Sequence, residues 1–300
     1  MRFGFVGAGN MGGAIIKGYA AAQAADVNKQ DPDALFVFDE AREKTEALVQ
    51  VTAVNTAQSL AELWGLCDCL VLCVKPNAVE AVLDEIVRVR AQAADTGASG
   101  GDAAKAPADP KLYISIAAGV SLAFLRSKLG EGARCVRVMP NTPAMVGEGM
   151  SALSAGGKLR DAEAAAAEGL FAAIGRAVWV PESQMDIVTG VSGSSPAYAY
   201  LYMEGLIRAG MEGGLSQEAA TLLAAQSTLG AAKMVLENRG ELRPDGARIG
   251  GVGPEQLRIN VCSPGGTTIE AVKVLEAANF RDTVEGAVRA AANKSRLMTK

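Results

Sequence analysis

The feature that most constrains this chain is a glycine-rich turn close to its N-terminus, at residues 7–12. A short apolar run, residues 2–6, precedes the turn and apolar residues at helical spacing follow it, which predicts a strand, a turn and a helix in that order. In such a turn Gly7 permits the tight bend, Gly9 lets a pyrophosphate approach the backbone, and Gly12 lets the helix pack against the strand. The helix N-terminus also presents free N–H groups to phosphates, so the pattern favours a dinucleotide-binding unit over a ligand-free turn. It does not distinguish a nicotinamide from a flavin.

Length and composition exclude several classes of protein. The chain has 300 residues, 49% of them hydrophobic, and a formal net charge of −4, which allows two domains and argues against a basic nucleic-acid-binding face. No apolar run approaches the length of a membrane span, and the N-terminus lacks the layout of a signal peptide. Five cysteines without an even framework favour a reducing compartment, so we expect a cytoplasmic protein. Because histidine is absent, a Ser-His-Asp triad, a zinc site with histidine ligands and a histidine acid are excluded, and no metal site is expected.

Strand-like and helix-like segments alternate through the first 181 residues. This alternation predicts an α/β fold with a mostly parallel sheet, the architecture of a Rossmann dinucleotide-binding domain. The low-complexity stretch at residues 94–110 is expected to be a long surface loop. The expected strands are residues 2–6, 35–38, 51–54, 69–74, 112–116, 135–139, 150–153 and 177–180, and the expected helices are residues 13–19, 78–93, 122–129 and 162–174.

Beyond Pro181 no strand-like run appears, and the pattern becomes helical. We therefore expect a Rossmann domain at residues 1–181 and an all-helical domain at residues 182–300. The first two long helices carry apolar residues on more than one face, which predicts at least a dimer through this domain. The long helices are expected at residues 196–213, Gln217–Glu237, 268–278 and 280–297.

Three of the expected strands end in residues that suit a ligand site, at residues 75–76, 117–119 and 140–143. In a doubly wound sheet, ligands bind beyond the carboxyl ends of the strands, where small residues let a flat ring lie against the backbone. Lys75 is the only cation among these residues. It is either a solvated lysine at a strand end or a functional group beside the cofactor, and its position favours the second interpretation.

Two dense motifs precede expected helices in the second domain. Residues 192–198 are explained by a capped helix start, with serine caps and a proline in the first turn. Residues 261–268 place two glycines and two threonines before a helix, a cradle that suits a carboxylate. A turn with a cap explains these glycines but not the cluster of hydroxyls. Cys67, Cys69 and Cys73 are interpreted as small buried hydrophobic residues rather than metal ligands.

Together these motifs resemble the pyrroline-5-carboxylate reductase family, over nearly the whole chain. The resemblance implies a Rossmann domain followed by a helical dimerisation domain, assembled as a homodimer or a ring of dimers. It implies reduction of the C=N bond of 1-pyrroline-5-carboxylate to L-proline, usually with NADPH, as the last step of proline biosynthesis. The motifs that carry the resemblance are residues 7–12, 74–76, 115–121, 139–143, 192–198 and 261–269, the last being the most specific.

The resemblance also implies roles for individual residues. Thr268 is expected to face the ring nitrogen of the substrate as the catalytic residue and, because threonine is a poor acid, to orient the ring rather than supply the proton. The residues expected to bind the substrate are Ser263, Gly265, Gly266, Thr267 and Thr268. The residues expected to bind the cofactor are Gly7, Ala8, Gly9, Asn10, Met11, Gly12, Asp39, Val74, Lys75, Pro76, Ala117, Ala118, Gly119 and Asn260.

Three features depart from the family pattern. Asp39 ends the second strand where the family commonly has a small hydroxyl residue, so it would repel a 2′-phosphate and favour NADH, unless Arg42 and Lys44 offset its charge. Ile259 stands where an acidic residue is common. Residues 240–253 resemble an insertion, as do residues 94–110, and neither has a functional interpretation.

Two other functions fit part of these motifs. A related imine or hydroxyacid reductase would share the turn at residues 7–12 but would not need residues 261–269 in this form. A non-catalytic NAD(P)-binding sensor would bind the nucleotide without turning over the imine. An assay of imine-dependent oxidation of NADPH and NADH separates these alternatives.

Overall fold

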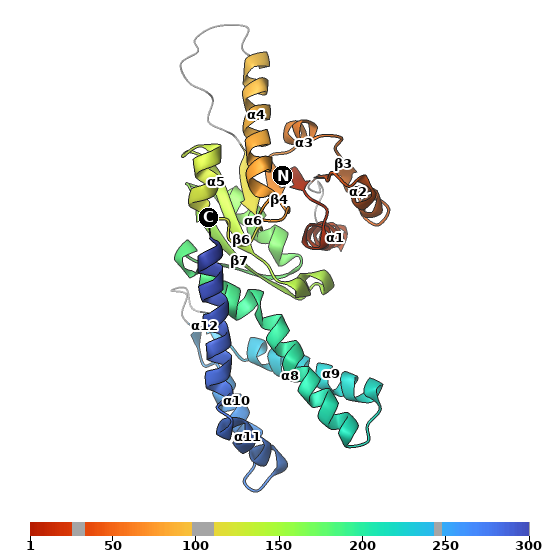
Figure 1. Ribbon diagram of the computed structural model, residues 1–300, viewed down its shortest axis with the longest axis vertical. Helices are drawn as coiled ribbons and strands as arrows, with labels where there is room; N and C mark the ends of the chain where they lie inside the picture. Colours follow the sequence, from red (N-terminus) through yellow and green to blue (C-terminus); the bar gives the residue numbers. More distant parts are fainter. Residues whose placement is uncertain (26–33, 98–110, 243–247, 300) are drawn as a thin grey trace. The chain divides into compact units, whose positions relative to one another are not determined.

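A computed structural model describes residues 1–25, 34–97, 111–242 and 248–299 (Figure 1). The chain forms two compact units, residues 1–196 with 288–300 and residues 197–287. The last helix, α12 (Phe280–Met298), contributes to both units. The compact units of the single chain divide after residue 196 and after residue 287. The domain boundary expected between residues 181 and 182 remains a prediction.

The first unit is built on an eight-stranded sheet with the order β3-β2-β1-β4-β5-β6-β7-β8. Neighbouring strands are parallel except β6 and β7, which are antiparallel. The order 3-2-1-4-5-6 is that of a Rossmann fold, so the predicted fold class is confirmed for this unit. The strands are β1 (Phe3–Val6), β2 (Leu35–Phe38), β3 (Asn55–Thr56), β4 (Cys69–Leu72), β5 (Leu112–Ser115), β6 (Arg134–Met139), β7 (Gly149–Gly156) and β8 (Gly175–Trp179).

Helices cover both faces of this sheet. One buried cluster joins Phe3 and Phe5 of β1 to α1 and α6, and the other joins Val6 of β1 to α3, α4 and α5. Burial on both faces explains why β1, β4 and β5 read as continuous apolar runs rather than alternating ones. The helices are α1 (Asn10–Ala25), α2 (Arg42–Val49), α3 (Leu60–Leu66), α4 (Val79–Gly97), α5 (Leu122–Leu129) and α6 (Asp161–Ala172).

Short helical segments complete the first unit before the chain enters α8 (Ser195–Glu212). They are η1 (Thr142–Val146), η2 (Glu182–Gln184), α7 (Met185–Val188) and the π-helical turn η3 (Thr189–Gly193). The second unit holds most of α8 together with α9 (Gln217–Glu237), β9 (Glu241–Leu242), β10 (Arg248–Ile249), α10 (Pro254–Asn260), α11 (Thr267–Ala277) and the start of α12. Its helices bury few residues within one chain: α8, α10 and α11 bury none, and α9 buries only two alanines.

Several expectations about elements are wrong. The third strand forms at Asn55–Thr56 rather than at residues 51–54, because Val51 N–H and the Thr52 hydroxyl bond to the Leu48 carbonyl and continue the end of α2. A two-stranded ladder of β9 and β10 lies beyond Pro181, where no strand was expected. Helix α4 runs to Gly97, so the first four residues of the expected loop at residues 94–110 are helical, and the rest of that stretch, residues 98–110, lies outside the described residues.

Helix α9 corrects the expectation that no apolar run approaches the length of a membrane span. By length and composition it is the one helix in the described part of the chain that could span a membrane. An 18-residue stretch of α9 has a mean hydropathy of 1.2, and only 11% of that stretch is buried. Three consecutive polar residues, Gln226, Ser227 and Thr228, interrupt the apolar stretch, so the sequence does not show it as one continuous run.

Candidate active site

The glycine-rich turn lies between β1 and α1, as predicted. Gly7 has a φ of +104°, and a Cβ there would lie 2.9 Å from the Cys73 carbonyl oxygen. A Cβ on Gly12 would collide with the Gly7 carbonyl oxygen, so neither position accepts a side chain. Gly9 differs, because nothing lies within 4 Å of a Cβ built on it. The fold thus demands glycine at two positions, whereas the third leaves open space beside the backbone, where a pyrophosphate fits.

The turn also presents hydrogen-bond donors. The backbone N–H of Gly9 has no acceptor in the described part of the chain, and the first N–H groups of α1 have none within the helix. No acidic residue lies in the first turn of α1, so its N-terminus keeps its positive character. These residues fit the phosphates of a dinucleotide.

Asp39 follows β2 and holds this turn from the side. Its Oδ2 accepts a hydrogen bond of 2.7 Å from the Ala8 N–H, and its Oδ1 accepts one of 2.9 Å from the Ala41 N–H. Lys44 Nζ lies 3.6 Å from Oδ1, and the Asp39 side chain is only 13% exposed. The carboxylate therefore fixes the backbone of the turn, a role that sequence reasoning missed, and Lys44 offsets its charge as expected.

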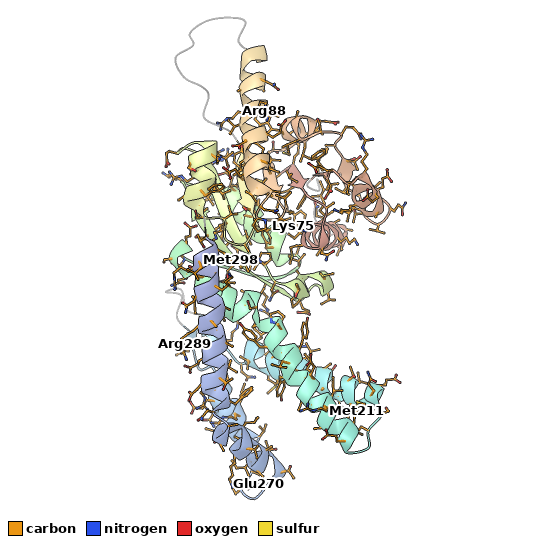
Figure 2. The ribbon with its side chains drawn as sticks, viewed as in Figure 1. Lys75, Arg88, Met211, Glu270, Arg289 and Met298 are labelled. Carbon is orange, nitrogen blue, oxygen red and sulfur yellow. The ribbon has the colours of Figure 1, made fainter. Side chains whose placement is uncertain are left out.

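The other predicted strand ends meet at the same edge of the sheet. The strand order reverses at β1, so the residues after β1 and β4 flank the crevice in which this fold binds ligands. Lys75 is exposed just beyond β4 (Figure 2). After β5, Ala117 N–H donates to the Ser115 hydroxyl at 3.3 Å, whereas the N–H groups of Ala118 and Gly119 find no acceptor among the described residues. Of these two residues Ala118 is exposed, whereas Gly119 is buried against the Met298 carbonyl, so the Ala118 amide is the one open to a ligand.

The motif after β6 contacts the start of the serine-rich motif. Asn141 Nδ2 donates to the Ser192 carbonyl at 3.1 Å, and its Oδ1 accepts from the Met150 N–H at 2.8 Å. A Cβ on Gly193 would lie 2.6 Å from Met139 Cε, the flexible end of that side chain, so the two motifs are in close contact here. Residues 139–143 and 192–194 therefore form one cluster in the first unit, which spacing along the sequence did not reveal.

The predicted substrate cradle lies in the second unit, between α10 and α11. Gly266 is the N-cap of α11 and its N–H donates to the Ser263 carbonyl at 3.0 Å, so the helix starts without a side-chain cap. Thr267 and Thr268 are the first two residues of α11. The hydroxyls of Ser263, Thr267 and Thr268 are exposed and have no hydrogen-bond partner within the described residues. The interpretation of Thr268 as a helix cap is therefore wrong, and the arrangement fits a carboxylate.

Asn260 precedes this cradle as the last residue of α10. Its Oδ1 accepts a hydrogen bond of 2.9 Å from Gln256 Nε2, and Ile259 beside it is 48% exposed. The predicted nucleotide residues other than Asn260 belong to the first compact unit, and the predicted substrate residues belong to the second.

Comparison with known proteins decides the family. Curated proteins named pyrroline-5-carboxylate reductase match this chain along its length. The one from Escherichia coli (strain K12) is 36% identical over 100% of this chain and 98% of its own, and the one from Pseudomonas aeruginosa is 37% identical over 98% and 95%. The chain belongs to the pyrroline-5-carboxylate reductase family. The resemblance predicted from the motifs is confirmed.

Family models and solved structures agree with this membership. Residues 182–298 match the pyrroline-5-carboxylate reductase dimerisation family, and residues 2–96 match the family of NADP oxidoreductases that are coenzyme F420-dependent. A reductase structure from Coxiella burnetii is similar with a TM-score of 0.82 and 33% identity, covering 100% of this chain and 98% of that one. The enzyme from Plasmodium falciparum, solved with NADP bound, has a TM-score of 0.77 and 31% identity over 100% and 98%.

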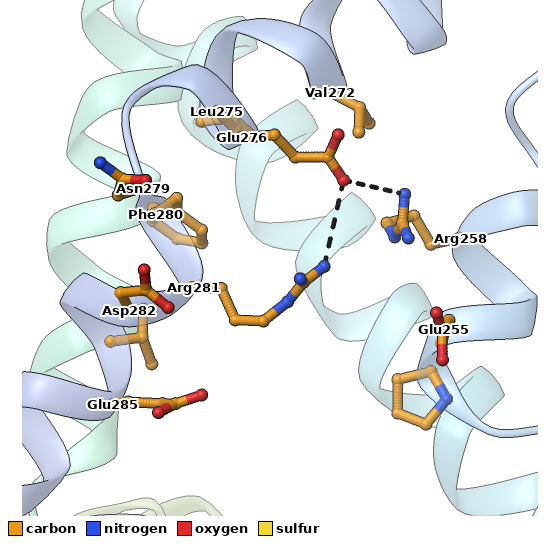
Figure 3. A pocket seen from close by; sticks show the side chains of 12 residues that line it. Glu255, Arg258, Val272, Leu275, Glu276, Asn279, Phe280, Arg281, Asp282 and Glu285 are labelled. Atoms are coloured by element: carbon orange, nitrogen blue, oxygen red, sulfur yellow. Dashed lines mark ion pairs between the residues drawn. The ribbon is translucent and has the colours of Figure 1, made fainter.

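A hollow in the second unit of this family member lies apart from the cradle. It has a volume of about 850 Å³ and is lined by residues of α10, α11 and α12 (Figure 3). Glu276 forms ion pairs there with Arg258 at 3.3 Å and Arg281 at 4.0 Å (Figure 3). None of the predicted site residues lines this hollow.

The cysteines of this family member behave as small apolar residues. Burial raises the pKa of the Cys67 thiol to about 11 and also raises the pKa values of Cys69 and Cys73. All five cysteines, which lie within the described residues, are free thiols. The described part of the chain holds no group of three acidic, cysteine or histidine side chains arranged for a metal ion. High thiol pKa values exclude a reactive thiolate at these three positions.

Proposed function

We propose that this protein reduces the C=N bond of 1-pyrroline-5-carboxylate to give L-proline, the last step of proline biosynthesis. The observation that carries the proposal is the uncapped cradle at residues 263–268, with three unpartnered hydroxyls, in a chain that matches pyrroline-5-carboxylate reductases over its whole length. A turn that served only to start a helix would have no use for these hydroxyls, because Gly266 already occupies the N-cap position.

The cradle supplies binding and orientation. The Ser263 hydroxyl and the N–H groups at residues 265–268 hold the substrate carboxylate, and the positive end of α11 favours its charge. The Thr268 hydroxyl then hydrogen-bonds the ring nitrogen as it becomes an amine. The proton on this nitrogen comes from water, because a threonine hydroxyl is too weak an acid to supply it. Positioning of this kind lowers the barrier by fixing the ring in one reactive orientation.

The first unit binds the nucleotide. Residues 7–12 hold the pyrophosphate, and residues 74–76 and 117–119 line the nicotinamide side. Asn260, which belongs to the second unit, stays a proposed cofactor-binding residue. When bound, the reduced nicotinamide supplies the hydride for the imine carbon. The N–H of the exposed Ala118, which has no acceptor among the described residues, and the exposed ammonium of Lys75 support this assignment, since both can donate to oxygen atoms of a nucleotide.

We propose NADPH as the cofactor, with NADH accepted because of Asp39. The reductase from Plasmodium falciparum binds NADP, which supports the phosphorylated nucleotide. Asp39 carries a negative charge at the end of β2, which favours a ribose hydroxyl over a 2′-phosphate. Lys44, 3.6 Å from that carboxylate, offsets part of the repulsion.

We also propose that the protein works as a homodimer, or a ring of dimers, in the cytoplasm. The match to a dimerisation family over residues 182–298 supports assembly through the helical unit. Leu201 is 70% exposed and Leu222 is 68% exposed in the single chain, and a second copy would cover such residues. The free state of all five cysteines supports a reducing compartment.

One assay tests the proposed activity. Purified protein is mixed with NADPH or NADH, and absorbance is followed with and without 1-pyrroline-5-carboxylate while proline is measured. We expect nucleotide oxidation only with the imine, in step with proline formation. As a control, 1-pyrroline lacks the carboxylate and should turn over poorly, because it cannot use the cradle. Tight nucleotide binding without proline would instead identify a sensor, and equal rates with both imines would identify a more general imine reductase.

A further inference from the structure

One carboxylate in the first unit joins three distant segments. Glu182 is the first residue of η2, and its Oε1 accepts two hydrogen bonds. One comes from the Leu122 N–H at 2.7 Å, and the other comes from Arg137 Nη1 at 3.1 Å. Arg137 lies on β6 and its side chain is only 8% exposed, so Glu182 is the counter-charge of a nearly buried guanidinium.

The bond from the Leu122 N–H lies at the end of the turn that follows β5. Leu122 is the first residue of α5, directly after residues 117–121. At the other end of the turn, the buried Ser115 hydroxyl accepts the Ala117 N–H at 3.3 Å. Side chains thus hold the turn at both ends, and Ala118 and Gly119, whose N–H groups lack an acceptor among the described residues, lie between them. Gly119 also lies against the Met298 carbonyl, so the exposed Ala118 N–H is the donor that the two attachments at the ends of the turn help to place.

The second bond, from Arg137, places Glu182 at a defined position along β6. Arg137 is the register partner of Ser115 on the neighbouring strand, so both attachments start from the same level of the sheet. A carboxylate near the N-terminus of α5 is also favoured by the helix dipole. The hydrogen bond from Arg137 therefore holds the Glu182 carboxylate in place, and this carboxylate in turn holds the Leu122 N–H.

We propose that Glu182 is a positioning residue for the nicotinamide side of the site. It holds the Leu122 N–H, and through it the turn at residues 117–121, where the N–H of the exposed Ala118 meets the nucleotide. This inference rests on the proposed function, which assigns that turn to the cofactor. It adds a residue outside every motif by which the family is recognised in this chain.

The same strand supplies a matched control. Arg134, three positions before Arg137 on β6, donates from Nε to Glu163 Oε1 at 2.9 Å, and the Glu163 side chain is 2% exposed. That pair joins β6 to α6 and makes no contact with the turn. Glu163 also pairs with Arg160, and its side chain is more buried than that of Glu182, which is 33% exposed. Its loss therefore reports, as an upper bound, what breaking an ion pair on β6 does to stability alone.

The test compares Glu182→Ala, Glu182→Asp, Glu182→Gln and Glu163→Gln with the wild type. For each we measure the Kd of NADPH by titration, the steady-state kcat and both KM values, and the melting temperature. We expect Glu182→Ala to weaken NADPH binding and raise the nucleotide KM about tenfold, the size typical of losing a hydrogen bond to a charged group. The KM for the imine should stay within about twofold, because the cradle is untouched.

The other variants make the result decisive. Glu182→Asp keeps the charge but is too short to reach both donors, so it should also weaken NADPH binding even if the alanine variant does not fold. Glu182→Gln keeps the acceptor oxygen and should restore NADPH affinity, while Glu163→Gln should lower only the melting temperature. The inference is overturned if Glu182→Ala or Glu182→Asp melts early with unchanged NADPH affinity, or if Glu163→Gln weakens NADPH equally. Absence of imine turnover in the wild type would overturn the proposed function instead, and the NADPH titration would still decide the role of Glu182.

Discussion

Thr268 is the second residue of α11, so its side chain does not cap that helix. Thr268→Val keeps the branched shape and removes only the polarity of the hydroxyl. If the hydroxyl orients the ring nitrogen, turnover should fall roughly 10- to 1,000-fold, by analogy with loss of one positioned donor. The Kd of NADPH and the melting temperature should change little. Steady-state rates, nucleotide titration and thermal melting on the same preparation check this.

Thr283 provides the control for that substitution. It lies on α12 in the same unit, and its hydroxyl donates only to the Asn279 carbonyl, at 3.0 Å. Thr283→Val should therefore leave turnover normal. A Thr268→Val protein that melts early but turns over at the wild-type rate would show that Thr268 is structural.

Asp39 has two roles that substitution can separate. We propose that its charge acts on the ribose end of the nucleotide, and its oxygens accept hydrogen bonds from the Ala8 and Ala41 N–H groups. Asp39→Ser should shift the ratio of kcat/KM values toward NADPH by about 1–3 kcal/mol, because a like-charge juxtaposition is removed. Asp39→Asn removes the charge but keeps an acceptor oxygen, so it should shift the ratio in the same direction. If instead Asp39→Ser weakens both nucleotides equally and Asp39→Asn changes nothing, the residue serves only the turn.

At the scale of elements, the sequence predicted helices correctly where residues at the helix ends supply the caps. Helix α5 forms at Leu122–Leu129 as expected, because the Ser121 hydroxyl accepts the Phe124 N–H at 3.0 Å and Gly130, with a φ of +104°, ends the helix. Helix α9 also has its expected bounds, since Ser216 caps its start. Such caps are readable in a sequence because the residues that make them lie within one turn of the helix end.

Several short elements were missed, with and without such signals. The strands β9 and β10 have two residues each, too few for alternation to be visible. Helix α10 was also missed, although Pro254 in its first turn is a recognised start signal. The contacts that support the candidate site were not predictable at all, because they join residues far apart: Ala8 and Asp39 are 31 positions apart, and Leu122 and Glu182 are 60 apart.

The attachment of α6 to β6 makes stability depend on pH. Burial opposes the charge of Glu163, but hydrogen bonds from Arg160 and the charge of Arg134 outweigh it and hold the pKa of Glu163 below its ordinary value of 4.5. A lowered pKa in the folded state means that the stabilisation is complete above the ordinary value and is lost as pH falls below it. Glu163→Gln should therefore lower the free energy of unfolding at pH 7 by about 1–3 kcal/mol, a cost that shrinks below pH 4.5. Urea unfolding at a series of pH values checks this, and a cost that stays constant with pH would contradict it.

At the scale of the whole molecule, we propose that a second copy of the chain completes the helical unit. Helix α8 buries no residue, although it carries Tyr200, Leu201 and Leu206, which are exposed large hydrophobic residues. The family model that matches this region is a dimerisation model, which supports a second copy as the cover for such residues. The same argument accounts for the membrane-like composition of α9, because a helix covered by a partner subunit needs the same apolar surface as one covered by lipid.

Leu222 tests this assembly. It lies on α9 and is 68% exposed in the single chain, so in a dimer through the helical unit Leu222→Asp would place a charge in a desolvated surface. Light scattering should show at least a dimer for the wild type and a shift to monomers for Leu222→Asp. We further propose that both chains shape each site, so turnover should be lost together with the dimer. Val51, 64% exposed in the first unit, is the matched control, and Val51→Asp should change neither mass nor turnover. A wild-type protein that turns over as a monomer at assay concentration would refute the proposed dimer, and a Leu222→Asp protein that stays dimeric would exclude this face of α9 from the interface.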